Sequence, residues 1–241
     1  MSRETVIWHD LECGSYAADL PYWQALAGRH PGVVLDVGAG TGRVALPLAR
    51  AGHRVVALER DASLAAELAR RAAAPSDGGR VLPIEVRCAD ACDFVLDRPV
   101  SLVIVPMQTI HLLNDRAAFL GCARRALVPG GVLAVALLGE GVEPFELELD
   151  PDAVQLGAVR YESAPTALRR RDGAVVLERR RSRIADGGWH SAIDVTRLAE
   201  CDRETLVAEA RATGFELLES RHIAPTSEHA GSEIVCLAVR T

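Results

Sequence analysis

A glycine-rich turn between an apolar strand and a helix constrains the fold of this chain more than any other feature. Residues 33–37 read Val-Val-Leu-Asp-Val, and glycines follow at positions 38, 40 and 42. Glycine lets the backbone turn sharply and lets a ligand approach without a Cβ in the way. The dinucleotide fingerprint GxGxxG needs a further glycine where this chain has Arg43. The spacing GxGxG therefore predicts a ligand-binding turn of a different kind.

An acidic residue ends the next apolar strand. Residues 54–58 read Arg-Val-Val-Ala-Leu, and Glu59 follows them. A carboxylate at this point can accept hydrogen bonds from both hydroxyls of a ribose, whereas a phosphate site disfavours a negative charge. The glycine-rich turn and Glu59 together therefore favour a ligand that carries a ribose.

Strands and helical segments alternate along residues 33–138. The predicted strands are Val33–Val37, Arg54–Leu58, Ile84–Arg87, Ser101–Val105 and Val132–Leu138. Asp61 is placed to cap one helix, and Asn114 and Asp115 open another, because short polar side chains accept hydrogen bonds from the first backbone amides. This alternation predicts a parallel sheet covered by helices on both faces.

The alternation stops after Gly139. Further strands are predicted at Ala158–Glu162, Ala174–Arg181 and Ser191–Leu198, followed by a helix from about Asp202 to Thr213 and a strand pair at Phe215–His222 and Glu233–Arg240. We therefore predict an α/β fold with a doubly wound, seven-stranded and mostly parallel sheet whose last strand is antiparallel. An antiparallel β insertion follows the fifth strand.

Composition excludes several classes of function. All 27 basic residues are arginine, so neither a lysine Schiff base nor a GxxxxGK[ST] phosphate loop can form. The net charge of −6 disfavours nucleic acid as a partner, because duplex-binding domains are usually basic. The six cysteines form no CxxC pair, so we expect reduced thiols in a cytoplasmic protein and no metal site. The first residues lack the apolar core of a signal peptide, and no apolar run is long enough for a bilayer, so we expect no membrane partner.

Four segments in order resemble motifs of one enzyme family. Residues 33–43 look like motif I of the class I, Rossmann-like S-adenosylmethionine-dependent methyltransferases, and residues 56–59 are similar to the second motif. Residues 88–91, Cys-Ala-Asp-Ala, resemble the acidic turn after the third strand, and Pro129-Gly130-Gly131 resembles the turn into the fifth. The resemblance spans roughly 33–138 and implies S-adenosyl-L-methionine as the cofactor.

The resemblance also implies which residues bind the cofactor. They are Asp36, Gly38, Ala39, Gly40, Gly42, Arg43, Glu59, Arg60, Asp90, Ala91 and Met107. The glycine backbone passes the methionine half, and Asp36 orders the loop or reaches the methionine amino group. Glu59 holds the ribose, and Asp90 accepts a hydrogen bond from the adenine amino group. Arg43 pairs with the methionine carboxylate, or is a solvated helix residue.

The segment after the fourth strand is expected to lie beside the transferred methyl group. His111 is the predicted base or substrate-orienting residue, because imidazole titrates near neutral pH, and Gln108 is a second candidate. The alternative for His111 is a histidine that packs or caps locally. Tyr16, Tyr22 and Trp23 are predicted substrate contacts in an amphipathic cover, although aromatic residues at such spacing also serve packing.

These observations predict an enzyme that transfers a methyl group to oxygen or nitrogen of a small molecule, in specialised metabolism. The segment after the fourth strand has no Asn/Asp-Pro-Pro-aromatic box and no Pro-Cys pair, which nucleobase methyltransferases carry. Two alternatives stay open: a methyltransferase for a protein, peptide or RNA, and a cofactor-binding regulatory homologue without catalysis.

Residues 1–241 are expected to form a single methyltransferase domain. Within it we predict a helical cover at 1–30, a cofactor-binding core at 31–139, a β insertion that caps the substrate at 140–199, and a helix with a strand pair at 200–241. Arginine groups at 169–171 and 179–183 read as a solvated antiparallel ribbon. The acidic run 140–152 offsets them within the fold or across a homodimer formed through the insertion.

Overall fold

The computed structural model describes residues 3–74, 81–139, 143–185, 187–226 and 229–240. The chain divides into two compact units, one of Tyr16–Glu140 with Cys201–Thr241 and one of Ser2–Ser15 with Gly141–Glu200. None of the described helices combines the length and the apolar character that crossing a membrane requires.

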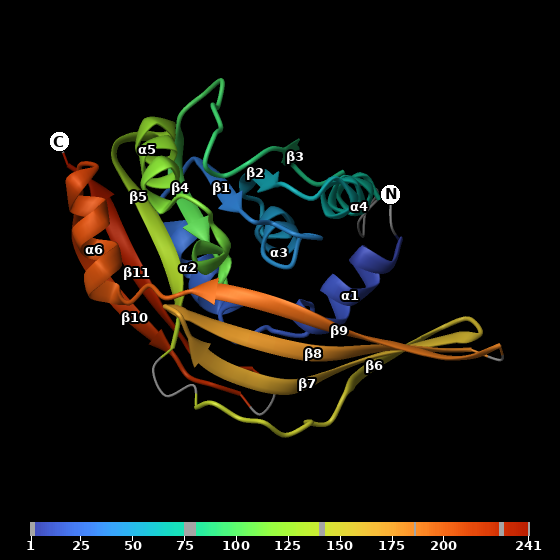
Figure 1. Ribbon diagram of the computed structural model, residues 1–241. Coiled ribbons are helices and arrows are strands. Elements are labelled where there is room, and N and C mark those ends of the chain that lie inside the picture. The colour runs from blue at the N-terminus through green and yellow to red at the C-terminus, as the bar shows by residue number, and fades with distance from the viewer. Residues whose placement is uncertain (1–2, 75–80, 140–142, 186, 227–228, 241) are drawn as a thin grey trace. The chain divides into compact units, whose positions relative to one another are not determined.

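The first unit contains the predicted seven-stranded sheet (Figure 1). Its strands are β1 (Val33–Val37), β2 (Arg54–Glu59), β3 (Ile84–Cys88), β4 (Val100–Val105), β5 (Leu127–Leu138), β10 (Phe215–Ile223) and β11 (Ser232–Val239). Their order is β10-β11-β5-β4-β1-β2-β3, and β11 runs antiparallel to both neighbours while the β1–β2, β2–β3, β1–β4 and β4–β5 pairs are parallel. The predicted fold class, including the antiparallel last strand, is confirmed.

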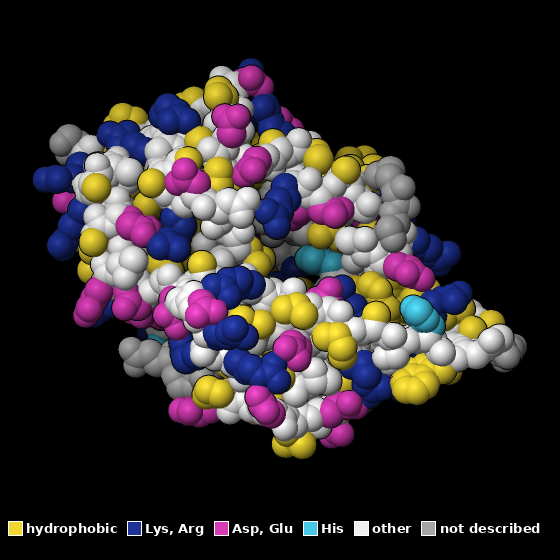
Figure 2. Space-filling view, viewed as in Figure 1, with side chains coloured by type: hydrophobic (Ala, Val, Ile, Leu, Met, Phe, Trp, Pro, Cys, Tyr) yellow, Lys and Arg dark blue, Asp and Glu magenta, His cyan; other side chains and the backbone are white. Residues whose placement is uncertain are grey.

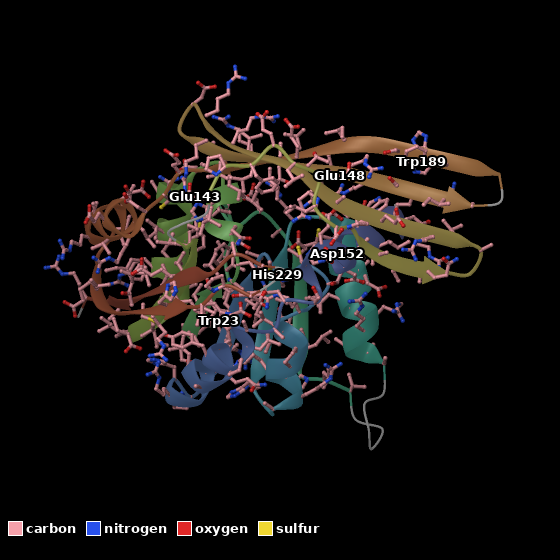
Figure 3. The ribbon with its side chains drawn as sticks, turned by 90° about the horizontal axis from the view of Figure 1, so that it is seen from below. Trp23, Glu143, Glu148, Asp152, Trp189 and His229 are labelled. Carbon is pink, nitrogen blue, oxygen red and sulfur yellow. The ribbon has the colours of Figure 1, made fainter. Side chains whose placement is uncertain are left out.

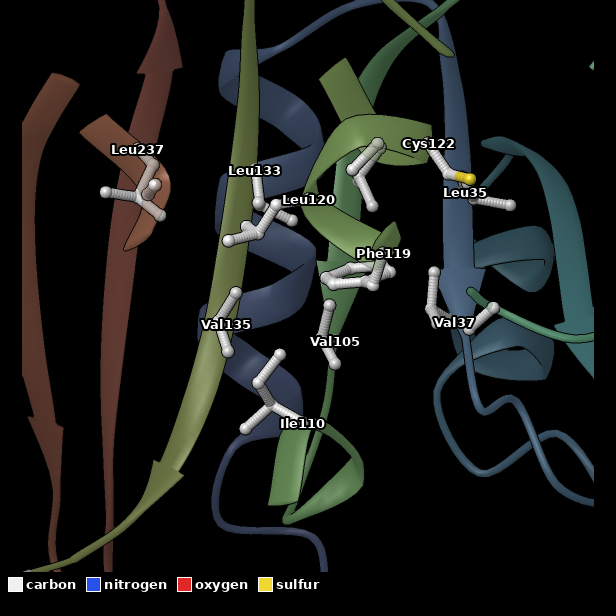
Figure 4. Close-up of a cluster of buried hydrophobic side chains, with 14 of the residues drawn as sticks. Leu35, Val37, Val105, Ile110, Phe119, Leu120, Cys122, Leu133, Val135 and Leu237 are labelled. Carbon is white, nitrogen blue, oxygen red and sulfur yellow. The ribbon is translucent and has the colours of Figure 1, made fainter. Parts of the chain in front are cut away.

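Helices cover both faces of this sheet. They are α2 (Leu20–Arg29), α3 (Ala45–Arg50), α4 (Ala62–Ala73), the 3-10 helix η1 (Thr109–Leu112), α5 (Arg116–Ala126) and α6 (Arg203–Ala212). Successive strand residues point to opposite faces. Leu35 and Val37 therefore pack with Phe119 of α5 in one buried cluster, shown in Figure 4, while Val34 packs with Trp23 of α2 in another.

The helix boundaries follow local chemistry. Asp61 caps α4 as predicted, because its carboxylate accepts from the amides of Ser63 and Leu64. Pro47 falls on the third residue of α3, within the first turn, where a helix tolerates proline best. The short length of α3 thus agrees with the position of its proline.

One strand boundary differs from the prediction. β5 begins at Leu127 rather than at Val132, and the Pro129-Gly130-Gly131 segment lies inside the strand. Its pairing with β4 shifts register between Val100 and Leu102. An irregularity of this kind accommodates a Pro-Gly-Gly segment without ending the strand.

The second unit contains an antiparallel sheet of four strands and one helix. The elements are α1 (Arg3–Cys13), β6 (Asp152–Leu156), β7 (Val159–Arg171), β8 (Ala174–Ala185) and β9 (Gly188–Ala199), with strand order β6-β7-β8-β9. This confirms the β insertion, although β6 was not predicted and the other strands are longer. Arg169 and Arg181 lie within these strands and form ion pairs with Glu178 and Glu12 at 2.6 and 2.7 Å.

The helix α1 packs on this four-stranded sheet. The rings of Trp8 and Tyr161 meet edge to face at 5.2 Å between centroids. Glu12 accepts hydrogen bonds from Ser163 Oγ and Arg181 Nε, both at 2.7 Å. The first half of the predicted helical cover is therefore part of the second unit, and α2 is part of the first.

Candidate active site at the carboxyl ends of the central strands

The glycine-rich loop follows β1 and is held by the end of β2. The amides of Gly38 and Ala39 donate to the carbonyl oxygen of Leu58 at 2.9 and 3.1 Å. Gly38, Gly40 and Gly42 have φ values of +70°, +55° and +102°. These values lie in the left-handed region, which side chains with a Cβ rarely adopt. The backbone of this loop therefore requires glycine at the alternating positions.

The same glycines also permit close packing. A Cβ on Gly38 would lie 2.5 Å from Cγ2 of Thr109, and one on Gly42 would lie 2.4 Å from Cδ1 of Leu68. Thr109 belongs to η1 and Leu68 to α4. The loop therefore contacts the segment after β4 directly, an arrangement that the sequence prediction did not include.

The carboxylate of Glu59 connects the loops that end β1 and β2. Its Oε2 accepts from the Gly40 amide at 2.9 Å, and its Oε1 accepts from the Asp61 amide at 2.8 Å. The residue is 8% exposed. Each carboxylate oxygen has a second lone pair, so these bonds leave acceptor capacity for a ligand hydroxyl. The ribose contact of Glu59 stays a prediction that this geometry permits.

Asp36 is a buried carboxylate without a hydrogen-bond partner among the described residues. It is 1% exposed, and neither oxygen has a partner of good geometry. Burial raises the pKa of Asp36 to about 7; the positive charge of Arg43 opposes this shift and Glu59 adds to it. The Ala45 amide, at the start of α3, also lowers the pKa. An orphaned buried carboxylate fits a cofactor that brings an ammonium group, and its proximity to Ala45 fits the loop-ordering alternative.

Arg43 is engaged by the protein rather than left open to a ligand. Its Nη1 and Nη2 donate to Oδ1 and Oδ2 of Asp19 at 2.6 and 2.9 Å, and Nη1 also donates to the Tyr16 carbonyl at 2.9 Å. The Arg43 and Asp19 side chains are only 8% and 1% exposed. The solvated-helix alternative for Arg43 is therefore wrong, and the predicted pairing with a methionine carboxylate has a buried competitor in Asp19.

Asp19 is the site residue that sequence reasoning missed. It precedes the Leu-Pro start of α2, a position that usually indicates a helix cap, yet its side chain makes no capping bond. Its Oδ2 instead also accepts from Trp23 Nε1 at 2.8 Å. Only the tertiary structure brings Asp19 to Arg43, so the local sequence offers no signal for the pair.

The segment after β4 turns sharply toward β5. Met107 has φ of 51°, an uncommon value for a residue with a side chain. His111 is 5% exposed, and its Nε2 accepts from the Leu138 amide at 3.0 Å. This bond uses the Nε2 lone pair, which argues against a base at that atom and favours the local-packing alternative. Gln108 and Met107 are half-buried.

The predicted adenine-side residues lie at the ends of β2 and β3. The Ala89 amide donates to the Glu59 carbonyl at 3.1 Å, which joins the two strand ends. Asp90 is exposed and accepts from the Cys92 amide at 2.8 Å, while Ala91 is buried and Arg60 is exposed. Asp90 therefore stabilises the turn through its bond from the Cys92 amide, and its contact with adenine stays a prediction.

Two of the three predicted aromatic substrate contacts pack inside the first unit. Trp23 is 0% exposed within the core. The Tyr22 hydroxyl contacts Cys236 Sγ at 3.3 Å, in the middle of β11. The structure therefore corrects the substrate-contact hypothesis for Trp23 and Tyr22 in favour of packing. Tyr16 is also buried, but its ring lies against Arg43, beside the glycine-rich loop.

Known protein sequences that resemble this chain are methyltransferases. Residues 34–131 match a family model described as a methyltransferase domain. The ubiquinone biosynthesis O-methyltransferase of Rhodopseudomonas palustris (strain HaA2) is 26% identical over 140 residues, which cover 58% of this chain and 52% of the relative. The enzyme of the same name from Methylocella silvestris is 32% identical over 115 residues, covering 46% and 42%. The chain spans about half the length of the curated relatives it matches.

Comparison with solved structures shows the same fold over nearly the whole chain. The sugar N-methyltransferase KedS8 from Streptoalloteichus sp. ATCC 53650 aligns with a TM-score of 0.75 and 20% identity, covering 100% of this chain and 94% of that one. The amino pentose methyltransferase CalS10 from Micromonospora echinaspora aligns with a TM-score of 0.71 and 18% identity, covering 100% and 98%. Residues 34–131 thus match a methyltransferase domain, and the chain as a whole has the fold of solved methyltransferases.

Proposed function

We propose that the chain transfers a methyl group from S-adenosylmethionine to nitrogen or oxygen of a small molecule in specialised metabolism. The observation that carries the proposal is the glycine-rich loop joined to Glu59 through the Gly40 amide, at the carboxyl end of β1. Ligands of open α/β sheets bind at the carboxyl ends of the strands. The sugar N-methyltransferase and O-methyltransferase names of the similar proteins support both acceptor atoms.

In this proposal the protein binds and aligns, because the cofactor supplies a methyl group that its sulfonium already activates. Glu59 uses its remaining lone pairs for the ribose hydroxyls. Asp36 stabilises the positive charge of the methionine end, and Asp90 binds the adenine amino group. The segment 107–111 lies against Gly38 through Thr109, so it is positioned to hold the acceptor in line with the transferred group.

The charge distribution favours a small acceptor over RNA. The arginines of the four-stranded sheet are largely paired: Arg180 with Glu148, and Arg181 with both Glu12 and Asp194. Figure 2 shows Lys/Arg and Asp/Glu side chains interspersed over the visible face. Nucleic-acid surfaces instead present unbalanced positive charge to the phosphates.

A panel of acceptors tests the proposed function. The protein is incubated with S-adenosylmethionine carrying a labelled methyl group and with glucosamine, a nucleotide-linked amino sugar, catechol, a peptide mixture or total RNA. We expect label in an amino sugar or a phenol. Label only in peptide or RNA would support the macromolecular alternative, and cofactor binding without transfer to any acceptor would support the regulatory one.

We further propose that the protein acts in the cytoplasm as a homodimer that pairs through β9. This strand is at one edge of the four-stranded sheet, and its Trp189, Ile193 and Val195 are 64%, 57% and 58% exposed (Figure 3 shows Trp189 on β9). These residues alternate, so they share one face. An antiparallel β9 pair centred on Ile193 places Trp189 of each copy opposite Arg197 of the other, which allows a cation–π contact.

Substituting Ile193 with arginine is expected to make this dimer dissociate. Two like charges would then meet at the centre of the paired strands, where apolar side chains are expected. Analytical ultracentrifugation of wild type and Ile193→Arg measures the change. Leu218→Arg is a matched control, because Leu218 is 52% exposed on β10 of the first unit. A monomeric wild type, or a dimer that Ile193→Arg leaves intact, would contradict the β9 interface.

A further inference from the structure

We infer that His229 is the residue that accepts the proton from the methyl acceptor, and that the ring of Tyr16 positions it; this inference rests on the proposed function. His229 lies outside the motifs at 33–43, 56–59, 88–91 and 129–131. It lies between β10 and β11 (labelled in Figure 3) and is half-buried. The inference follows from its place at the sheet edge and from its contact with Tyr16.

Backbone hydrogen bonds place His229 at the same strand end as His111. The Gly139 amide, just after β5, donates to the Gly231 carbonyl at 2.9 Å. The preceding amide, that of Leu138, donates to His111 Nε2. His229 is two residues from Gly231, and its amide and carbonyl bond with Thr226 at 3.0 and 2.9 Å. The turn that carries His229 is therefore anchored at the carboxyl end of β5, where the cofactor loop and η1 also lie.

Tyr16 connects His229 to the glycine-rich loop. Its ring centroid lies 5.1 Å from that of His229 and 5.0 Å from Cζ of Arg43. Arg43 directly follows Gly42 and is fixed by the carboxylate of Asp19. A rotation of the Tyr16 ring would disturb both contacts, so the Asp19–Arg43 pair sets the position of the Tyr16 ring and, through it, that of His229.

The Tyr16 hydroxyl is a further sign of a ligand. Tyr16 is 4% exposed, and its oxygen has no hydrogen-bond partner of good geometry among the described residues. Burial raises the pKa of Tyr16 more than the nearby Ser232 hydroxyl and Arg43 lower it, so the hydroxyl stays protonated and can donate. A buried hydroxyl without a partner is uncommon unless a ligand or water completes its hydrogen bonding.

The proton transfer balances without a further reactant. The lone pair of the acceptor nitrogen or oxygen forms the bond to the methyl carbon, while the carbon–sulfur bond breaks and its electron pair remains on sulfur. The acceptor atom then carries one proton too many. Neutral imidazole of His229 takes that proton and releases it to water. Among the described residues, Arg43 lies over the Tyr16 ring and forms an ion pair with Asp19.

The test compares His229→Gln with His222→Gln, a matched control on β10 whose histidine is exposed. With the best acceptor of the panel, we expect His229→Gln to lower kcat by about a hundredfold and to remove the acidic limb of the pH–rate profile. Affinity for S-adenosylmethionine should hold in both variants, and His222→Gln should keep wild-type rates. An unchanged kcat and pH profile in His229→Gln would overturn the inference.

The role of Tyr16 is tested by two substitutions with different effects on the ring. Tyr16→Leu removes the aromatic contact and should lower kcat with the same pH signature. Tyr16→Phe keeps the ring and should restore the wild-type pH–rate profile, while the loss of the hydroxyl weakens binding of the ligand to which it donates. A purely structural tyrosine would instead lower thermal stability in both variants and leave the pH–rate profile unchanged, which would contradict positioning by the ring.

A measurement without an acceptor separates this inference from the proposed function. Diethyl pyrocarbonate modifies accessible histidines, and mass spectrometry reports the rate at each one. S-adenosylhomocysteine should protect His229 and leave His222 unaffected. Protection without turnover of any acceptor would support the placement of His229 while the proposed function fails. Modification of His229 at the same rate with and without S-adenosylhomocysteine would overturn the inference even if an acceptor is found.

Discussion

Replacing Glu59 with alanine is expected to weaken binding of S-adenosylmethionine by a hundredfold or more. Glu59 accepts from the Gly40 and Asp61 amides, so the substitution frees both loops as well as removing the ribose acceptor. A hydrogen bond to a charged group contributes about 1.5–3 kcal/mol, and the loss of two such bonds to the ribose corresponds to at least roughly a hundredfold in affinity. Isothermal titration calorimetry measures the change.

A control is needed because loosened loops also affect stability. Glu85→Ala removes a carboxylate from β3 whose side chain is 56% exposed, and it should leave the affinity unaltered. Thermal unfolding of both variants shows whether Glu59→Ala remains folded. A folded Glu59→Ala protein with wild-type affinity would remove Glu59 from the cofactor site.

Substituting Asp36 with asparagine is expected to stabilise the cofactor-free protein at high pH and not at low pH. Burial raises the pKa of Asp36 to about 7, so the folded protein holds this proton more tightly than the unfolded chain. The free energy of unfolding therefore falls as the pH rises from about 4 to about 7, and the full loss is present above 7. A rise of about three pKa units corresponds to roughly 4 kcal/mol, which is an upper limit.

Thermal unfolding of wild type and Asp36→Asn at pH 5 and pH 8.5 tests this sign. The variant should melt higher than wild type at pH 8.5, and the difference should shrink or reverse at pH 5. Asp202→Asn gives the opposite control, because bonds from Thr205 lower the pKa of Asp202, and its substitution removes stability that is present at high pH. Parallel melting curves for wild type and Asp36→Asn at the two pH values would contradict a buried, protonated Asp36.

The features that the sequence predicts correctly are those that depend on residues close together in the chain. Asp61 caps its helix because the capping geometry involves only the next three residues. The seven-stranded, mostly parallel sheet with an antiparallel last strand followed from alternating elements and the family resemblance, and the structure contains this sheet.

The features that sequence did not predict depend on residues far apart in the chain. Asp19 and Arg43 are separated by 24 positions, and only the packing of α2 on α3 brings them together. His111 was expected to face a substrate, but its hydrogen bond to Leu138 involves a strand 27 residues away. The division of the N-terminal helices between two units likewise depends on contacts between distant segments.

The contact between Gly38 and Thr109 has a consequence for redesign of this protein. Directed evolution of acceptor range usually enlarges or reshapes side chains near the transferred group, and Thr109 is an obvious target there. Its Cγ2 already fills the space beside Gly38, because a Cβ on Gly38 would lie 2.5 Å from it, so a larger side chain that keeps this direction would press on the glycine-rich loop. A substitution at position 109 alone would therefore change the affinity for the methyl donor and the fit of the acceptor at the same time.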